Sequence, residues 1–257
     1  MKIRDRSISI LIIFGLFFTI LFSSIARSKK PKQHVPASTE EVRVIVSELL
    51  KYAPQDLRSR NEAQKEKLKA EGKGPLTPTA ELRVETYWNG QLDSTDQEWD
   101  VVFYRGVEDA KFVILKGDAT GKKHIKWESQ LLPSTGASID TVDDLNKDGK
   151  HEIVLFFPHR SIVGAQIYTW DGREAVLLPF DDDGKEHSSI GGNDIYFKDM
   201  DSDGIAEVIE SSRLEIPMDS TYQNTEFVQE TKIYRWNGRE YQLWEKSRKS
   251  LPKPKER

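Results

Sequence analysis

Two short acidic segments contain the residues of this chain that could do chemistry. Asp144–Glu152 and Asp199–Glu207 both follow the pattern D-x-[DN]-x-D-G-x-x-E, and they begin 55 residues apart. Carboxylates at this alternating spacing repel one another unless a cation lies between them, and the spacing directs their oxygens toward one centre. We therefore expect each segment to bind a hard cation that prefers oxygen ligands, and Ca²⁺ is the ion that fits best.

Each acidic loop offers oxygens at positions one, three, five, seven and nine, with a glycine at position six for the sharp bend. The second loop has four carboxylates, whereas the first has three carboxylates and an amide. Because ligand charge helps to set calcium affinity, we expect the second loop to bind more tightly. The predicted ligands are Asp144, Asn146, Asp148, the carbonyl of Lys150 and Glu152 in the first loop, and Asp199, Asp201, Asp203, the carbonyl of Ile205 and Glu207 in the second.

Two other interpretations of these segments stay open. A helix-flanked calcium loop would have a bidentate acid at position twelve, where the first loop has Leu155, and the β-branched and aromatic run Ile153–Phe157 indicates a strand instead of a helix. Asp, Asn and Gly also favour ordinary metal-free turns. Two full matches, each directly before an apolar run, favour the metal site.

The composition limits the other functional classes. The net charge of −4 gives no basis for a nucleic-acid partner, and the absence of cysteine excludes disulfides, thiolate metal sites and thiol nucleophiles. The five histidines do not have a zinc-binding spacing, and no G-x-S-x-G motif is present. No catalytic constellation is found, so the sequence does not predict an enzyme.

The amino terminus, residues 1–27, has the layout of a signal anchor or a signal peptide. Lys2, Arg4 and Arg6 precede an uncharged stretch, residues 7–26, that is about long enough to span a bilayer. Calcium loops of ordinary affinity fill where free calcium is roughly millimolar. We therefore expect the globular part to be exported, either anchored in the membrane and facing outside the cytoplasm or, if the segment is cleaved, periplasmic or secreted.

Residues 28–79 are predicted to form a linker that contains two helical segments. Residues 39–53 have an apolar stripe at helical spacing, and Pro54 ends it. Residues 55–72 are half charged and are expected to form a solvated helix or connector.

A β-repeat domain is predicted over residues 80–246, followed by a basic tail, 247–257. The order of acidic loop, two strands, tight turn and strand occurs in repeats at about 131–182 and 186–246, and residues 211–230 are expected to be a long loop of the latter. A degenerate repeat at about 80–130 is aligned by placing Asp96 on Asp148 and Asp100 on Glu152, and it should not bind metal. The predicted strands are Leu82–Trp88, Trp99–Tyr104, Lys111–Leu115, Ile153–Phe157, Ala165–Trp170, Ala175–Leu178, Glu207–Glu210, Thr231–Trp236 and Tyr241–Trp244.

An acidic loop that runs directly into an apolar strand resembles the FG-GAP/VCBS-type repeats of integrin-like β-propellers, and the resemblance covers roughly residues 99–244. It implies calcium-stabilised blades and an extracytoplasmic binding or adhesion role without catalysis. The expected fold is mainly β, a small or partial propeller-like array of four-stranded repeats that follows an N-terminal transmembrane or signal helix and an amphipathic helix. Closed propellers have about four to eight blades, so three copies could be completed by a homo-oligomer.

The expected function is therefore an extracytoplasmic calcium-binding module with a binding, adhesion or scaffold role, in which the ions are structural. Its partner would be a protein or a carbohydrate, and the membrane would be contacted through the N-terminal helix. The alternative is a cell-envelope enzyme, for example one acting on polysaccharide, with the calcium loops as scaffolding.

Overall fold

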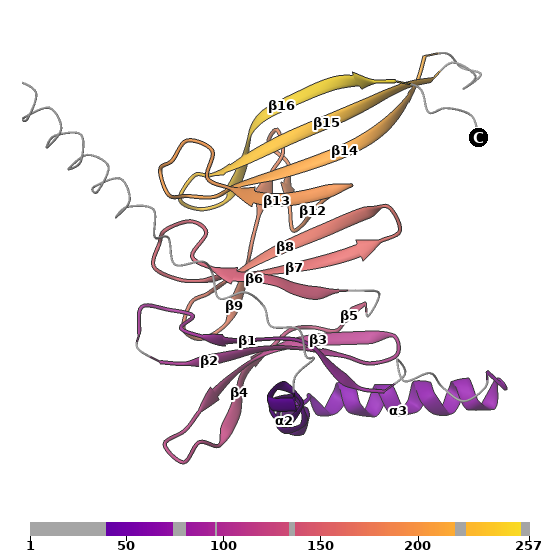
Figure 1. The fold of residues 1–257 in the computed structure, drawn as a ribbon, viewed down its shortest axis with the longest axis vertical. Helices are drawn as coiled ribbons and strands as arrows, with labels where there is room; N and C mark the ends of the chain where they lie inside the picture. Colours follow the sequence, from indigo (N-terminus) through magenta and orange to yellow (C-terminus); the bar gives the residue numbers. More distant parts are fainter. Residues whose placement is uncertain (1–39, 74–80, 96, 134–136, 219–224, 253–257) are drawn as a thin grey trace, which may run out of the picture. The chain divides into compact units, whose positions relative to one another are not determined.

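The structure, a computed structural model, describes residues 40–73, 81–95, 97–133, 137–218 and 225–252 (Figure 1). The predicted signal segment, the linker residues 28–39 and 74–79, Asp96 and residues 253–257 of the predicted tail lie outside these residues. The described chain is mainly β, as predicted, with three sheets that follow two α-helices. In the described ranges, no helix combines the length and the apolar character needed to cross a membrane.

The two helices lie close to their predicted positions. Helix α2 (Glu40–Leu49) continues into a 3-10 turn, η1 (Leu50–Tyr52), and α3 spans Gln55–Ala70. Pro54 separates them because its ring clashes with a continuing helix and it has no N–H to donate. The apolar faces of the helices pack on the first sheet, and the buried residues of this cluster are Leu49, Ala53, Leu57, Val84, Val102, Tyr104, Val113 and Leu115.

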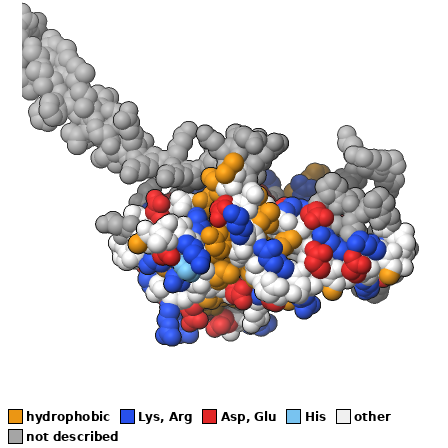
Figure 2. All heavy atoms as spheres, turned by 90° about the horizontal axis from the view of Figure 1, so that it is seen from below, with side chains coloured by type: hydrophobic (Ala, Val, Ile, Leu, Met, Phe, Trp, Pro, Cys, Tyr) orange, Lys and Arg blue, Asp and Glu red, His pale blue; other side chains and the backbone are white. Residues whose placement is uncertain are grey.

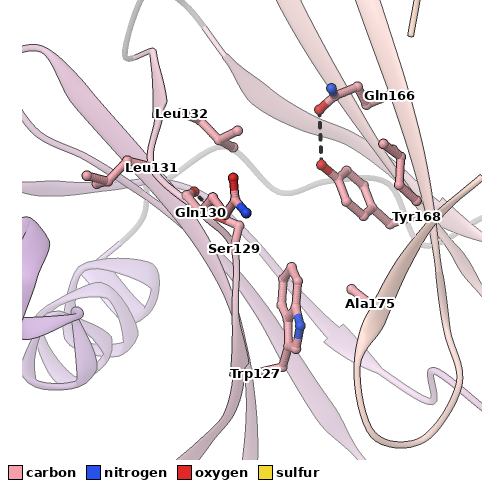
Figure 3. Close-up of a pocket in the computed structure, with 9 residues that line it drawn as sticks. Trp127, Ser129, Gln130, Leu131, Leu132, Gln166, Tyr168 and Ala175 are labelled. Carbon is pink, nitrogen blue, oxygen red and sulfur yellow. Dashed lines mark hydrogen bonds between the residues drawn. The ribbon is translucent and has the colours of Figure 1, made fainter. Parts of the chain in front are cut away.

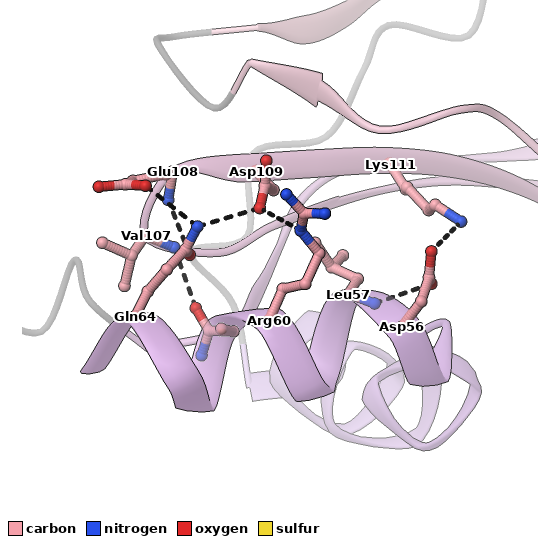
Figure 4. A network of polar contacts seen from close by, with 9 residues as sticks. Asp56, Leu57, Arg60, Gln64, Val107, Glu108, Asp109 and Lys111 are labelled. Carbon is pink, nitrogen blue, oxygen red and sulfur yellow. Dashed lines mark hydrogen bonds and ion pairs between the residues drawn. The ribbon is translucent and has the colours of Figure 1, made fainter. Parts of the chain in front are cut away.

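Helix α3 is more than a solvated connector, because polar side chains attach it to the turn between strands β2 (Trp99–Arg105) and β3 (Asp109–Gly117), as Figure 4 shows. The Asn61 side chain is buried, and its Oδ1 accepts the Val107 N–H at 2.9 Å. Arg60 forms an ion pair with Asp109 at 3.0 Å, and Gln64 donates to the same carboxylate. These contacts fix the helix against the sheet.

The first sheet has the order β1-β2-β3-β4, and β5 also pairs with β3. Its neighbouring strands are antiparallel and follow one another along the chain. The strand bounds are β1 (Arg83–Gly90), β2 (Trp99–Arg105), β3 (Asp109–Gly117), β4 (Lys123–Glu128) and β5 (Leu132–Pro133).

The second and third sheets contain the same succession of strands. In the second sheet, each strand of the run β6-β7-β8-β9 pairs with the next, and β12 also pairs with β8. In the third sheet, each strand of the run β13-β14-β15-β16 pairs with the next, and β10 and β11 extend the sheet beyond β16. The bounds are β6 (Ser138–Asp143), β7 (Glu152–His159), β8 (Ile162–Trp170), β9 (Ala175–Leu178), β10 (Phe180–Asp181), β11 (Glu186–His187), β12 (Ile190–Gly192), β13 (Asp194–Lys198), β14 (Glu207–Pro217), β15 (Thr225–Trp236) and β16 (Tyr241–Leu251).

Two predictions near the C-terminus were wrong. Residues 211–230 are not mainly a loop, because β14 and β15 continue as a paired hairpin from Val208↔Tyr234 to Pro217↔Thr225. The predicted basic tail is partly strand, since β16 pairs with β15 as far as Leu251. Cross-strand charge pairs, including Arg248 with Glu230 at 2.6 Å, stabilise this polar extension, whose sequence lacks the apolar alternation of a half-buried strand.

The cores between the sheets follow from the alternation of side chains along each strand. On β7, Ile153 and Leu155 belong to a cluster shared with the first sheet, whereas Val154 belongs to a cluster shared with the third. The second sheet is therefore covered on both faces. The described residues form three sheets and do not show a propeller. On the face in Figure 2, acidic and basic side chains are interspersed, as is usual for a solvated surface.

Candidate metal centre

Both acidic loops occupy the same place in their sheets, between the first and second strands. The first loop connects β6 to β7 and is closed by the pair Asp143↔Glu152. The second connects β13 to β14 and is closed by Lys198↔Glu207. The β1–β2 connection is closed by Gly90↔Trp99 and has the same length. The three connections therefore correspond to one another in register.

Backbone hydrogen bonds link the three connections in the same way each time. The His151 N–H donates to the Leu92 carbonyl at 2.9 Å, and the Ala206 N–H donates to the Leu145 carbonyl at 2.8 Å. Both donors directly precede the second strand, and both acceptors lie two residues after the end of the first. Each acidic loop is thus joined to the connection that precedes it in the chain.

This register corrects the alignment of the degenerate repeat by one residue. Trp99, not Asp100, occupies the place of Glu152 and Glu207, because each of these three residues belongs to the strand pair that closes its connection. The pleat of the strands then fixes which side chain faces the neighbouring sheet. Trp99 is buried and packs edge-on against Trp170 at 5.2 Å between ring centroids. An apolar contact therefore replaces the acid at this position.

The two acidic loops share three internal hydrogen bonds. The carboxylate at position nine accepts the N–H of position two, at 2.9 Å in the first loop and 2.7 Å in the second. The side chain at position three accepts the N–H of position five, and the side chain at position five accepts the N–H of position seven. The matched spacing of the two sequences therefore gives the same local conformation.

The second loop brings three of its predicted ligands together. Oxygens of Asp199, Asp201 and Glu207 all lie within 4.8 Å of one another, which suits them to share one cation. Asp199 is oriented by the N–H groups of Ser202 at 2.7 Å and Gly204 at 2.9 Å. Gly204 has φ +89°, a conformation that glycine adopts without steric cost, so the bend needs this residue.

A basic side chain that the sequence analysis did not consider lies against this group. Arg235 donates from Nη2 to Asp201 Oδ2 at 2.7 Å, and its Nε lies 3.2 Å from Glu207 Oε1. Its guanidinium also stacks on Trp244, with Cζ 3.4 Å from the ring centroid. Arg235 therefore neutralises part of the charge at the site. The sequence held one clue to this contact: Arg235 directly precedes the tight turn that begins at Trp236, so its place in the repeat could be read from the turn.

The first loop has no such cation at the corresponding place, which is held by Thr169 just before Trp170. Glu152 is buried, and burial together with the nearby charges of Asp148 and Asp144 raises its pKa to about 8. Asp144 Oδ1 is also buried, and no residue in the described ranges forms a hydrogen bond with it. An added cation would compensate these carboxylates.

The predicted ligands are thus positioned unequally. Among the described residues, only Asp199, Asp201 and Glu207 form a group of three acidic or metal-binding side chains with mutually close ligand atoms. Asp203 belongs to the predicted set but lies outside this group, and the carboxylates of the first loop do not converge to the same degree. Asn146 donates from Nδ2 to Glu152 at 3.3 Å, which orients its Oδ1 toward the Asp148 N–H. The carbonyls of Lys150 and Ile205 stay predicted ligands.

No protein-family model matches this chain, and comparisons with curated proteins and with solved structures found no significant match.

Proposed function

We propose that this chain is an extracytoplasmic calcium-binding β-repeat module whose two acidic loops bind structural ions. The observation that carries the proposal is the convergence of Asp199, Asp201 and Glu207 at the mouth of a strand-to-strand connection. Oxygen ligands and a flexible loop suit Ca²⁺ better than metals that prefer nitrogen or sulfur. The first loop shares the internal hydrogen bonds of the second, and no lysine or arginine in the described part of the chain forms an ion pair with its buried Glu152.

The ions would stabilise contacts between the sheets. Each acidic loop donates a backbone hydrogen bond to the connection before it, so a rigid loop also fixes the neighbouring sheet. In this proposal the three sheets are successive repeats of an FG-GAP/VCBS-type array, and the N-terminal segment anchors or exports them. The module itself binds a protein or a carbohydrate and performs no catalysis.

The test is the melting temperature of the full chain in a zwitterionic detergent, with calcium and with a chelator. For a dissociation constant of about 10–100 µM, about 1 mM calcium stabilises the fold by roughly 1.4–2.7 kcal/mol per site. This corresponds to a rise in melting temperature of about 3–10 °C for a domain of this size. A melting temperature that does not respond to calcium would exclude both sites.

Matched variants assign the effect to the loops. Glu152→Gln and Glu207→Gln keep the side-chain shape and an oxygen that accepts the loop N–H, so each should remove the contribution of one site. The double variant should have no calcium response, and a retained response would contradict the proposal. Asp183→Asn, at an acidic turn outside the two loops, serves as the control and should respond like the unaltered chain.

A further inference from the structure

A second candidate binding site lies away from the acidic loops, in a pocket between the first and second sheets (Figure 3). Its volume is about 370 Å³, within the lower range of pockets that bind small molecules. The side chains come from the end of β4, from the segment that joins β4 to β5, from the start of β5, and from strands β8 and β9. The nine lining residues are Trp127, Ser129, Gln130, Leu131, Leu132, Gln166, Tyr168, Ala175 and Leu177.

One side of the pocket is a fixed aromatic corner. Trp127 and Tyr168 lie 6.5 Å apart between ring centroids, and both pack on the buried ring of Phe112, at 4.9 Å and 5.1 Å. Both rings remain partly exposed although they are held by this contact. A ring that is fixed in advance loses little conformational entropy when a ligand stacks on it.

The polar side chains of the pocket are neutral hydrogen-bonding groups. Gln166 Oε1 accepts the Tyr168 hydroxyl at 3.1 Å, which orients the amide and keeps its NH₂ group as a donor. Gln130 is exposed at the rim and offers both a donor and an acceptor. None of the nine lining residues that the structure describes carries a charge, so these residues offer no group to pair with an ionic ligand.

We propose that this pocket binds a neutral carbohydrate, about the size of a mono- or disaccharide. A sugar presents an apolar C–H face that fits an aromatic ring and hydroxyl groups that pair with side-chain amides, and the pocket supplies both on adjoining walls. An extended proline-rich peptide also docks on aromatic side chains and is the competing ligand class. The inference rests on the binding role proposed above and gives it a ligand class.

The experiment is a calorimetric titration of the full chain, kept in a sugar-free zwitterionic detergent, with maltose, cellobiose and diacetylchitobiose. At least one disaccharide should bind, and Trp127→Ala should weaken its affinity by about tenfold or more. Gln166→Leu, which keeps the volume but removes the amide, should weaken it by about fivefold. Tyr196→Ala, at an exposed aromatic residue of the third sheet, is the matched control and should bind like the unaltered chain.

The proposal is overturned if none of the three sugars binds at about 20 mM, or if the Trp127 and Gln166 variants bind as the unaltered chain does. Binding of a polyproline octapeptide without sugar binding would assign the pocket to peptides and would overturn it as well. Circular dichroism checks that each variant is folded. The calcium test measures melting and this test measures sugar binding, so either proposal can fail while the other stands.

Discussion

Arg235 and Asp201 form a 2.7 Å hydrogen-bonded ion pair at the mouth of the second acidic loop, and the guanidinium is held there by the Trp244 ring. The first loop has Thr169 at the corresponding place. A fixed positive charge beside the candidate ligands repels an incoming cation and occupies a ligand oxygen. The two loops therefore differ in more than their number of carboxylates.

Arg235→Thr, which copies the residue of the first loop, should raise the calcium affinity of the second loop by about tenfold. Removal of one unit charge about 6 Å from a divalent ion is worth about 1.4 kcal/mol at a dielectric close to that of water, which suits this solvent-accessible pair. Calorimetric titration in a Glu152→Gln background, where the first loop is inactive, isolates this site. Arg239→Thr, at an exposed residue of the neighbouring turn, is the control. An unchanged or weaker affinity would show that Arg235 does not compete with the ion.

The predicted ranking of the two loops can be tested in the Arg235→Thr background. With the arginine removed, the four carboxylates of the second loop should make it the tighter site, because ligand charge helps to set affinity. Asp201→Ala should then weaken the tighter of the two binding steps, and Asn146→Ala should weaken the other. Calcium titration of the two variants compares them directly, and the reverse assignment would refute the ranking.

Stability without calcium should fall as the pH rises. The folded-state pKa of Glu152 is raised to about 8, above its ordinary value of 4.5, so the folded chain holds a proton that the unfolded chain releases. The stability from this proton is fully present below about pH 4.5 and is lost as the pH rises through about 8. The steepest loss is about 1.4 kcal/mol per pH unit.

Urea unfolding in chelator between about pH 5 and pH 9 measures this loss. Glu152→Gln should flatten the profile, because the amide does not titrate. Saturating calcium should also reduce the loss, since the ion favours the ionised carboxylate. A profile that is the same in the unaltered chain and in Glu152→Gln would show that another group is responsible.

The attachment of α3 to the β2–β3 turn predicts a coupled pair of substitutions. Asn61→Ala should destabilise the fold by about 1–3 kcal/mol because it removes the buried side-chain oxygen that accepts the Val107 N–H. Gly106→Ala should also destabilise it, since the new Cβ would lie 2.7 Å from Asn61 Oδ1. The Gly106→Ala cost should be smaller in the Asn61→Ala background, where the clash is gone.

Chemical unfolding of the two single variants and the double variant completes this cycle. Costs that simply add would mean that the two residues do not interact. Glu66→Ala is the control for general effects at the exposed side of α3, and it should cost well under 1 kcal/mol because its ion pair with Lys69 is at the surface.

The strands that were predicted correctly have strong local signals. The run from Ile153 to Phe157 is β-branched and aromatic, and it lies within β7. The tight turns after Trp170 and Trp236 need positive φ, which Gly172 and Gly238 adopt. Strands with weak local signals were missed: β4 and the outer halves of β14, β15 and β16 contain more polar than apolar residues. They are strands because a neighbouring strand pairs with them.

The sequence alone determined the local chemistry of this protein. The spacing of Asp, Asn and Gly in each acidic loop sets the backbone turns and the internal hydrogen bonds, because these depend only on residues a few positions apart. The tertiary structure decided the relationships between distant segments. It placed Arg235 on Asp201, buried Glu152 opposite Thr169 instead of an arginine, and put Trp99 where the other two repeats have an acid. These outcomes depend on strand register and sheet packing, which bring together residues that lie tens of positions apart in the chain.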